Sequence, residues 1–98
     1  MTVYVDDMRR KARVGNIDAR WSHLFADTSQ ELVAFGAQLG LLPSWLQHAG
    51  TYREHFDVTD SKRTAALAAG AVAVAYPRGT AGLLDTKRQD HAGKEIDR

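Results

Sequence analysis

The chain has 98 residues, of which 44% are hydrophobic and 26% are charged, which is typical of one small globular domain and excludes two separate cores. Thirteen Lys and Arg residues against twelve Asp and Glu residues leave a net charge of +1, which excludes a global field that attracts nucleic acid or anionic lipid. The absence of cysteine excludes disulfides and thiolate metal sites and fits a reducing environment, so we expect a cytoplasmic protein.

The N-terminal segment predicts a strand followed by a basic loop. Residues over about 2–6 have high β propensity, and Asp6 and Asp7 end the run. A cluster of basic side chains at 9–13 then leads to a turn signal at 15–16. We therefore expect a loop or an irregular crossover after the first strand, with two carboxylates at the strand end.

The next segment predicts a second strand and the clearest helix of the chain. Aromatic residues alternate over 20–26 and place His23 between two of them on one face of the strand. Thr28 and Glu31 have the spacing of a capping box, in which Thr28 caps the start of a helix. This helix should end at Gly40, because glycine adopts the left-handed conformation at a helix end without strain.

The remaining sequence predicts four further elements, which are a short helical turn at 43–48, a third strand at 55–58, a second helix at about 60–69 and a fourth strand at 71–76. In the third strand, His55 and Asp57 share one face because side chains alternate along a strand. The longest apolar stretch, at 65–76, is too short to cross a bilayer.

The order of these elements predicts an α/β fold. A β-β-α-β-α-β order favours a small mixed or mostly parallel four-stranded sheet with two main helices and a short helical turn. We assign residues 1–79 to this single domain. Residues 80–98 are polar and contain few large apolar side chains, so we expect a disordered C-terminal tail.

Polar side chains gather where the predicted strands end, which is where functional groups of α/β sheets converge. Carboxylates and imidazoles suit a divalent metal ion that activates water or neutralises phosphate. The candidate metal ligands are Asp6, Asp7, His55 and Asp57. The candidate catalytic groups are Asp7, His55, Asp57 and Lys62. Candidate phosphate-binding groups are Arg63, Arg9 and Arg10, and His23 and Asp27 are candidates for support. The hypothesis is a metal- or phosphate-binding module with nuclease-like phosphodiester hydrolysis.

Structural explanations compete with this hypothesis. Asp6 and Asp7 can pair with neighbouring arginines, Asp27 can stabilise the start of the first helix, and His23 can be a hydrogen-bonded structural residue. The alternative function is a non-catalytic module that binds a host or phage protein through exposed aromatic residues and the tail. Nucleic acid and a second copy of the chain are further candidate partners, whereas a membrane is not expected.

Four blocks of sequence, in order, carry a resemblance to a known family. They are Met1-Thr2-Val3-Tyr4-Val5-Asp6-Asp7, then Trp21-Ser22-His23-Leu24 with Ala26-Asp27 and Glu31-Leu32, then His55-Phe56-Asp57-Val58-Thr59 with Lys62-Arg63, and Ala69-Gly70-Ala71. From residue 1 to about 76, the chain resembles the family catalogued as domain of unknown function 4031. That family occurs in actinobacteria and their phages, so the resemblance implies a bacterial or phage cytoplasmic protein. It implies no activity, cofactor or partner.

Overall fold

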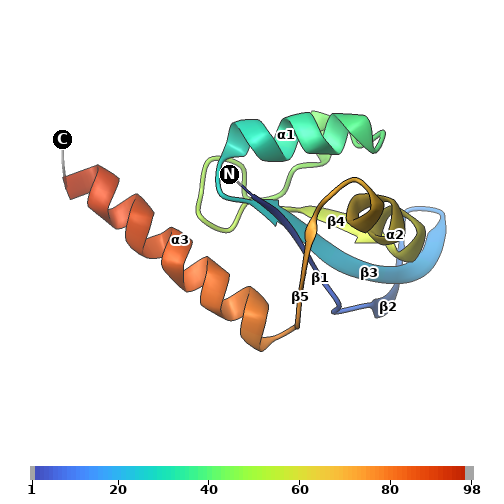
Figure 1. The fold of residues 1–98 in the computed structure, drawn as a ribbon. Helices are drawn as coiled ribbons and strands as arrows, with labels where there is room; N and C mark the ends of the chain where they lie inside the picture. Colours follow the sequence, from blue (N-terminus) through green and yellow to red (C-terminus); the bar gives the residue numbers. More distant parts are fainter. Residues whose placement is uncertain (1, 97–98) are drawn as a thin grey trace.

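The structure is a computed structural model that describes the backbone of residues 2–96 and the side chains of residues 2–89. It contains a mixed sheet with helices on both sides (Figure 1). The elements in chain order are β1 (Val3–Asp6), β2 (Arg10–Val14), β3 (Ile17–Ala26), α1 (Ser29–Gln38), the short 3-10 helix η1 (Pro43–Trp45), β4 (Phe56–Thr59), α2 (Asp60–Ala68), β5 (Val72–Val74) and α3 (Arg78–Ile96). This confirms the predicted α/β class.

The long strand β3 organises the sheet. Its partners β1, β2 and β4 all run antiparallel to it, and β5 is parallel to β1. Trp21 pairs with both β2 and β4, while Leu24 pairs with both β1 and β4. Therefore β1 and β2 lie along the same edge of β3, and β4 lies along the other edge. The sheet is mixed, as predicted, but β1 and β5 form its parallel pair, so antiparallel pairing dominates.

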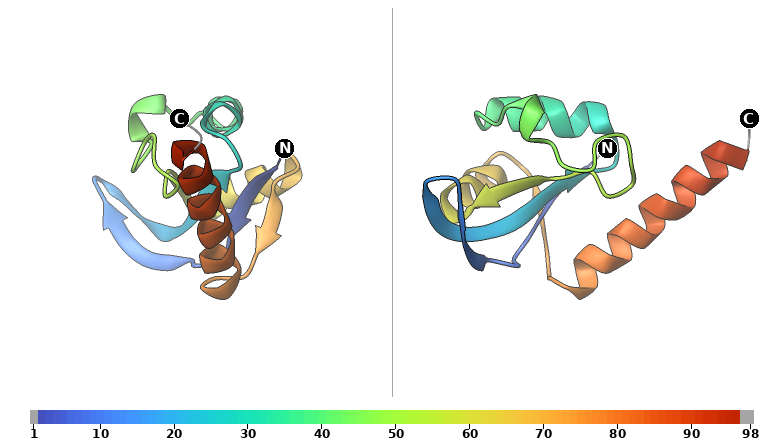
Figure 2. Two further views of the ribbon diagram at one scale, coloured as in Figure 1. Left: turned by 90° about the vertical axis from the view of Figure 1, so that its left-hand side faces the viewer. Right: turned by 180° about the vertical axis from the view of Figure 1, so that it is seen from behind.

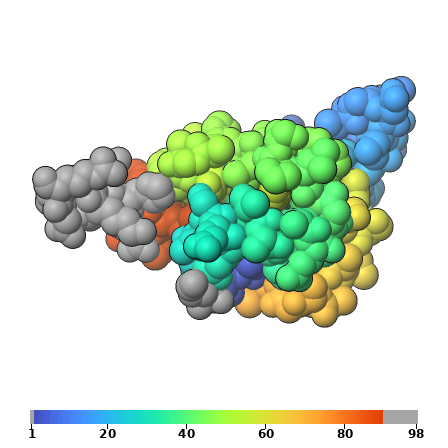
Figure 3. Space-filling view, turned by 90° about the horizontal axis from the view of Figure 1, so that it is seen from above, coloured from blue at the N-terminus to red at the C-terminus, as the bar shows by residue number. Residues whose placement is uncertain are grey.

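The sheet has five strands where the sequence predicts four. The fifth is β2, which replaces the predicted loop and forms a hairpin with the first half of β3. The chain between β1 and β2 leaves the ladder at Arg9, which has a positive φ of 48° and donates its backbone N–H to Ser22 Oγ at 3.0 Å. The hairpin projects at one end of the molecule (Figure 3).

The first helix follows its sequence signals closely. Thr28 Oγ1 accepts the backbone N–H of Glu31 at 3.2 Å and donates to the Glu31 carboxylate at 3.0 Å. The helix ends before Gly40, which has a φ of +80°. This confirms the predicted capping box and helix end.

Helices α1 and α2 cover one face of the sheet, and α3 begins on the opposite side and extends away from the body (Figures 1 and 2). The core between α1, α2 and the sheet is built mainly from Val5, Leu24, Leu32, Phe56 and Val58, which are almost completely buried. Among the described residues, no helix combines the length and hydrophobicity that a membrane-spanning segment needs.

Helix α1 approaches β4 so closely that Gly36 leaves no room for a side chain. A Cβ atom at this position would lie 2.7 Å from Cε2 of Phe56. We expect Gly36→Ala to lower the free energy of unfolding by about 1–2 kcal/mol in chemical denaturation, because overpacking outweighs the better helix propensity of alanine. The control is Gly82→Ala in α3, where an added Cβ would meet nothing within 4 Å apart from the neighbouring backbone of its own helix, and a small gain is expected. Equal effects of the two substitutions would contradict the close approach.

Helix α3 covers residues for which the sequence predicts a disordered tail. Its start is tied to the sheet, because Thr80 is buried and its Oγ1 donates to Asp6 at 2.9 Å. Further along, Leu84 lines a pocket together with Phe25 of β3. The predicted domain end at residue 79 therefore falls inside the first turn of α3. Composition alone does not reveal the long-range contacts that hold this helix.

Lys87 is a buried cation in α3 that we expect to cost stability. Its side chain is 8% exposed, and its ammonium has no hydrogen-bond partner among the described residues. Burial also lowers the pKa of Lys87, although Glu54 and Asp27 act against this. Lys87→Met should therefore stabilise the fold by about 1 kcal/mol and raise the melting temperature by about 4–8 °C. The control is Lys11→Met at an exposed position, which should leave the melting temperature unchanged. A lower melting temperature for Lys87→Met would show that the amine is paired.

Candidate metal centre

Three side chains of the types that bind metals lie together on the sheet face opposite α1 and α2. The β3–β4 register places His23 directly opposite Asp57, and His55 lies two residues before Asp57, on the same face. Each of the three offers one ligand atom, and these atoms all lie within 4.8 Å of one another. The His23 and His55 rings meet edge to face, with centroids 5.0 Å apart.

A buried carboxylate orients the His23 ring. Asp6 is completely buried, and its Oδ2 lies 2.7 Å from His23 Nδ1. Since an ionised carboxylate only accepts, Nδ1 carries the proton and Nε2 keeps its lone pair for a ligand. Asp6 also accepts from the backbone N–H groups of His23 and Met8 and from the Thr80 hydroxyl. A carboxylate hydrogen-bonded to an imidazole is the arrangement that commonly supports metal-ligating histidines.

His55 is oriented by a backbone carbonyl. Its Nδ1 lies 2.7 Å from the carbonyl oxygen of Arg53, so Nδ1 donates, and in the neutral ring Nε2 keeps a lone pair for a ligand. Nε2 lies 3.4 Å from Asp57 Oδ1. The second carboxylate oxygen of Asp57 accepts from the side-chain amide of Gln47. All three candidate ligands therefore have a neighbour that fixes their orientation, and each remains partly exposed, with side-chain exposures of 23%, 18% and 32% for His23, His55 and Asp57.

The two members of the His55–Asp57 pair stabilise each other's charged form. Burial lowers the pKa of His55, but the hydrogen bonds to Asp57 and to the Arg53 carbonyl outweigh it, so the pKa of His55 is raised above its usual value. The hydrogen bond from His55, opposed by burial, lowers the pKa of Asp57. An ion at this position would take the place of the proton between them.

The cluster opens into a pocket of about 280 Å³. Phe25 and Leu84 contribute apolar surface to it, while Arg53 and Tyr76 add a cation and a phenol. A third imidazole, His48, also lines this pocket, with its ring centroid 5.9 Å from that of His55. The pocket could hold a small ligand beside an ion bound at the cluster.

The hydrogen bonds of Asp6 make its charge a source of acid sensitivity. Burial raises the pKa of Asp6, but the hydrogen bonds from His23 and Thr80 outweigh it, so the pKa lies below its ordinary value of 3.8. The folded state then binds fewer protons at Asp6 than the unfolded state, so this stabilisation is complete above that value and is lost as the pH falls through the folded pKa. We expect the free energy of unfolding between about pH 6 and pH 3 to fall more steeply for the wild type than for Asp6→Asn. Parallel slopes would contradict this assignment.

Two of the four predicted metal ligands do not join the cluster as ligands. Both oxygens of Asp6 are occupied by hydrogen bonds, so Asp6 supports His23. Asp7 is exposed, and its Oδ1 accepts the backbone N–H of Tyr76 at 2.7 Å. The other two, His55 and Asp57, lie together, as the shared strand face predicts.

The basic residues and Asp27 have structural contacts of their own. Lys62 Nζ donates to the Leu39 carbonyl at the end of α1, and Arg63 Nε donates to the Asp6 carbonyl at 2.8 Å. Arg9 pairs with Asp60 at 2.8 Å, while Arg10 is exposed on β2. Because β3 runs antiparallel to β1, Asp27 lies at the opposite end of the sheet, where it accepts from Tyr4 and from the backbone of Thr2. A supporting role for Asp27 requires β3 to run parallel to β1, so that the ends of both strands lie at the same edge of the sheet.

Several residues of the site carry no recognisable sequence signal. His23 is predicted only as support, yet the β3–β4 register makes it a candidate ligand. Arg53, Gln47 and Tyr76 lie in irregular segments, and long-range contacts bring them to the site. A strand pairing that aligns His23 with Asp57 is the signal that would have identified His23 as a third candidate ligand.

Fold and site together define a class of protein: a small mixed α/β domain with two histidines and one carboxylate clustered on a sheet face. The sequence model of one family, described as Protein of unknown function (DUF4031), matches residues 3–86, so the chain belongs to this family. The match extends into α3, beyond the residues that carry the resemblance. No significant match is found among curated proteins or among solved structures.

Proposed function

We propose that this protein binds a divalent transition-metal ion through His23, His55 and Asp57. One observation carries the proposal: three ligand atoms lie within 4.8 Å of one another, and both histidines have Nδ1 engaged in a hydrogen bond. Neutral imidazoles with a free Nε2 are the form in which histidine binds metals.

The donor set selects the kind of ion. Two imidazoles and one carboxylate suit zinc, iron or manganese better than magnesium, which prefers an oxygen environment. Three protein ligands leave at least one position for water, as in catalytic rather than structural sites. A water molecule held there loses a proton more easily than in bulk water and becomes a nucleophile near neutral pH.

The chemistry we propose for this site is hydrolysis of a phosphate ester. Arg53 lines the adjoining pocket and can neutralise a phosphate oxygen, and His48 lies beside His55. In the reaction, a water oxygen bonds to phosphorus and the bond to the leaving oxygen breaks. The leaving oxygen takes up a proton, so hydrolysis consumes one water and needs no oxidant or reductant.

Metal binding is tested by titrating zinc or manganese into the full chain and following both the heat released and the melting temperature. An ion at about 100 times its dissociation constant should stabilise the fold by about 2.7 kcal/mol. Asp57→Asn and His55→Ala should weaken binding at least about 10-fold, since each removes one of three ligands. Asp18→Asn, on the exposed end of the hairpin, is the matched control. Unchanged affinity in Asp57→Asn and His55→Ala would refute the site.

Hydrolysis is tested with a chromogenic phosphodiester in the presence of the ion that binds. The wild type should release the chromophore and Asp57→Asn should not, while Asp18→Asn should match the wild type. If the ion binds but no phosphodiester is cleaved, the metal site stands and the hydrolytic proposal fails.

A further inference from the structure

The candidate ligands border two separate hollows. His23 and His55 line the pocket of about 280 Å³, whereas Asp57 lines a second, larger groove of about 510 Å³. The 3.4 Å contact between His55 Nε2 and Asp57 Oδ1 joins the two. A ligand held at the ion would therefore have space on both sides. A long, chain-like substrate needs this space, whereas a compact substrate does not.

Each hollow presents an exposed aromatic side chain. Tyr76 lines the pocket and is 45% exposed, and Trp45 lines the groove and is 53% exposed. Trp21 lies in the same groove, anchored by a hydrogen bond from its indole to the Ala12 carbonyl. Exposed aromatic rings along a channel are the feature on which unpaired nucleic acid bases stack.

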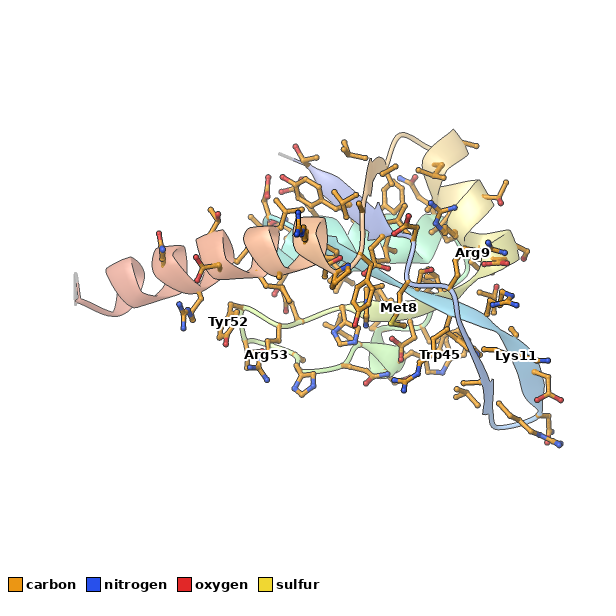
Figure 4. All side chains as sticks on the ribbon, turned by 90° about the horizontal axis from the view of Figure 1, so that it is seen from below. Met8, Arg9, Lys11, Trp45, Tyr52 and Arg53 are labelled. Carbon is orange, nitrogen blue, oxygen red and sulfur yellow. The ribbon has the colours of Figure 1, made fainter. Side chains whose placement is uncertain are left out.

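The charges that line the hollows favour a polyanion. Arg53 lines the pocket and Lys62 lines the groove, and Arg10 lies directly opposite Trp21 on the same face of the hairpin. Among the described residues that line either hollow, Asp57 is the one acid, and it is a candidate metal ligand. Figure 4 shows Trp45 and Arg53 along the same side of the molecule, both in the segment before β4. Local positive charge attracts phosphates even though the whole chain is almost neutral.

We propose that the substrate of the metal site is a single-stranded nucleic acid. It crosses the His23–His55–Asp57 cluster with its backbone at the ion, and one base lies on Trp45 in the groove and another on Tyr76 in the pocket. This inference rests on the proposed function, because the cluster fixes where the scissile phosphate lies. A duplex is disfavoured because its bases are paired and stacked and cannot reach the aromatic rings.

The test measures binding of a fluorescent single-stranded DNA of about 12 nucleotides to the full chain, by fluorescence anisotropy at low salt with a chelator present. Trp45→Ala and Tyr76→Ala should each weaken binding by about fivefold or more, as the loss of one stacked base predicts. Leu42→Ala is the control, because Leu42 is 52% exposed and lines neither hollow. The affinity of the wild-type protein for the single strand should fall as the salt concentration rises. Its affinity for the duplex of the same sequence should be weaker.

Metal titrations of the same variants separate this inference from the proposed function. Trp45→Ala should bind the metal ion as the wild type does, because Trp45 lines the groove and is not one of the three candidate ligands. If the protein binds the ion but not the oligonucleotide, the proposed substrate is refuted and the metal site stands. A protein segment is then the candidate occupant of the groove. Equal binding of duplex, or unchanged binding in both aromatic variants, also refutes the inference. If the oligonucleotide binds but the ion does not, the proposed function fails instead.

Discussion

Replacing Asp6 by alanine is expected to lower the free energy of unfolding by about 3–5 kcal/mol. The carboxylate is completely buried and accepts from the His23 ring, from the Thr80 hydroxyl and from two backbone N–H groups. Alanine would leave these buried and partly buried donors without an acceptor, and each unsatisfied group costs free energy. The loss would also release the start of α3, which Thr80 ties to the sheet.

Chemical denaturation measures this effect, and the neighbouring carboxylate provides the control. Asp7 is exposed and accepts one hydrogen bond, from the backbone of Tyr76, so Asp7→Ala should cost only about 1 kcal/mol. Asp6→Asn keeps the size of the side chain but has one fewer acceptor oxygen. Its stability should lie between those of the wild type and Asp6→Ala. If Asp6→Ala and Asp7→Ala cost the same, the network around Asp6 is not as described.

The second large effect is expected at the centre of the core. Phe56 is 1% exposed and contacts Gly36 across the interface between β4 and α1. Phe56→Ala should lower the free energy of unfolding by about 3–5 kcal/mol, because it removes buried apolar surface and leaves a cavity that the rigid sheet cannot fill. His55 and Asp57 flank this residue, so the loosened strand should also hold the cluster less firmly.

Denaturation curves and zinc titrations of Phe56→Ala check both parts of this expectation. Leu42→Ala, at a side chain that is 52% exposed, should change stability by no more than about 0.5 kcal/mol. A loss at Phe56 that is no larger than the loss at Leu42 would show that β4 is not packed under α1.

The sequence predicts the regular parts of this fold well because their signals are local. The capping box of Thr28 and Glu31 and the glycine at position 40 define α1 within a few residues. Strand alternation is also local, which is why the shared face of His55 and Asp57 was predictable. Strand pairing is not local, and its direction decides which strand ends meet. The assumption of parallel neighbours misplaced Asp27 for that reason.

Two further differences have the same origin. The basic run after β1 becomes strand β2 because the hairpin partner in β3 supplies its hydrogen bonds, and Arg9 takes the positive φ that lets the chain rejoin the ladder. Helix α3 is polar by composition, yet its first turns dock through Thr80 and Leu84. In each case a distant residue provides the stabilising contact, so a local pattern cannot reveal it.

The candidate site combines these two kinds of information. The sequence indicates two candidate ligands, His55 and Asp57. The third is His23, which the register between β3 and β4 places opposite Asp57. Asp6, expected to be a ligand, has the supporting role of orienting His23. The sequence therefore indicates His23, His55 and Asp57 as residues of interest, whereas their roles and the other residues of the pocket depend on topology.

The most direct test of the metal site is a crystal structure of the zinc-loaded chain with anomalous diffraction at the zinc edge. The proposal predicts one strong anomalous peak about 2.0–2.2 Å from Nε2 of His23, Nε2 of His55 and a carboxylate oxygen of Asp57. The hydrogen bonds of Asp6 and of the Arg53 carbonyl to the two rings should be retained. A peak at other side chains, or no peak while the His23–Asp6 contact persists, would contradict the metal centre.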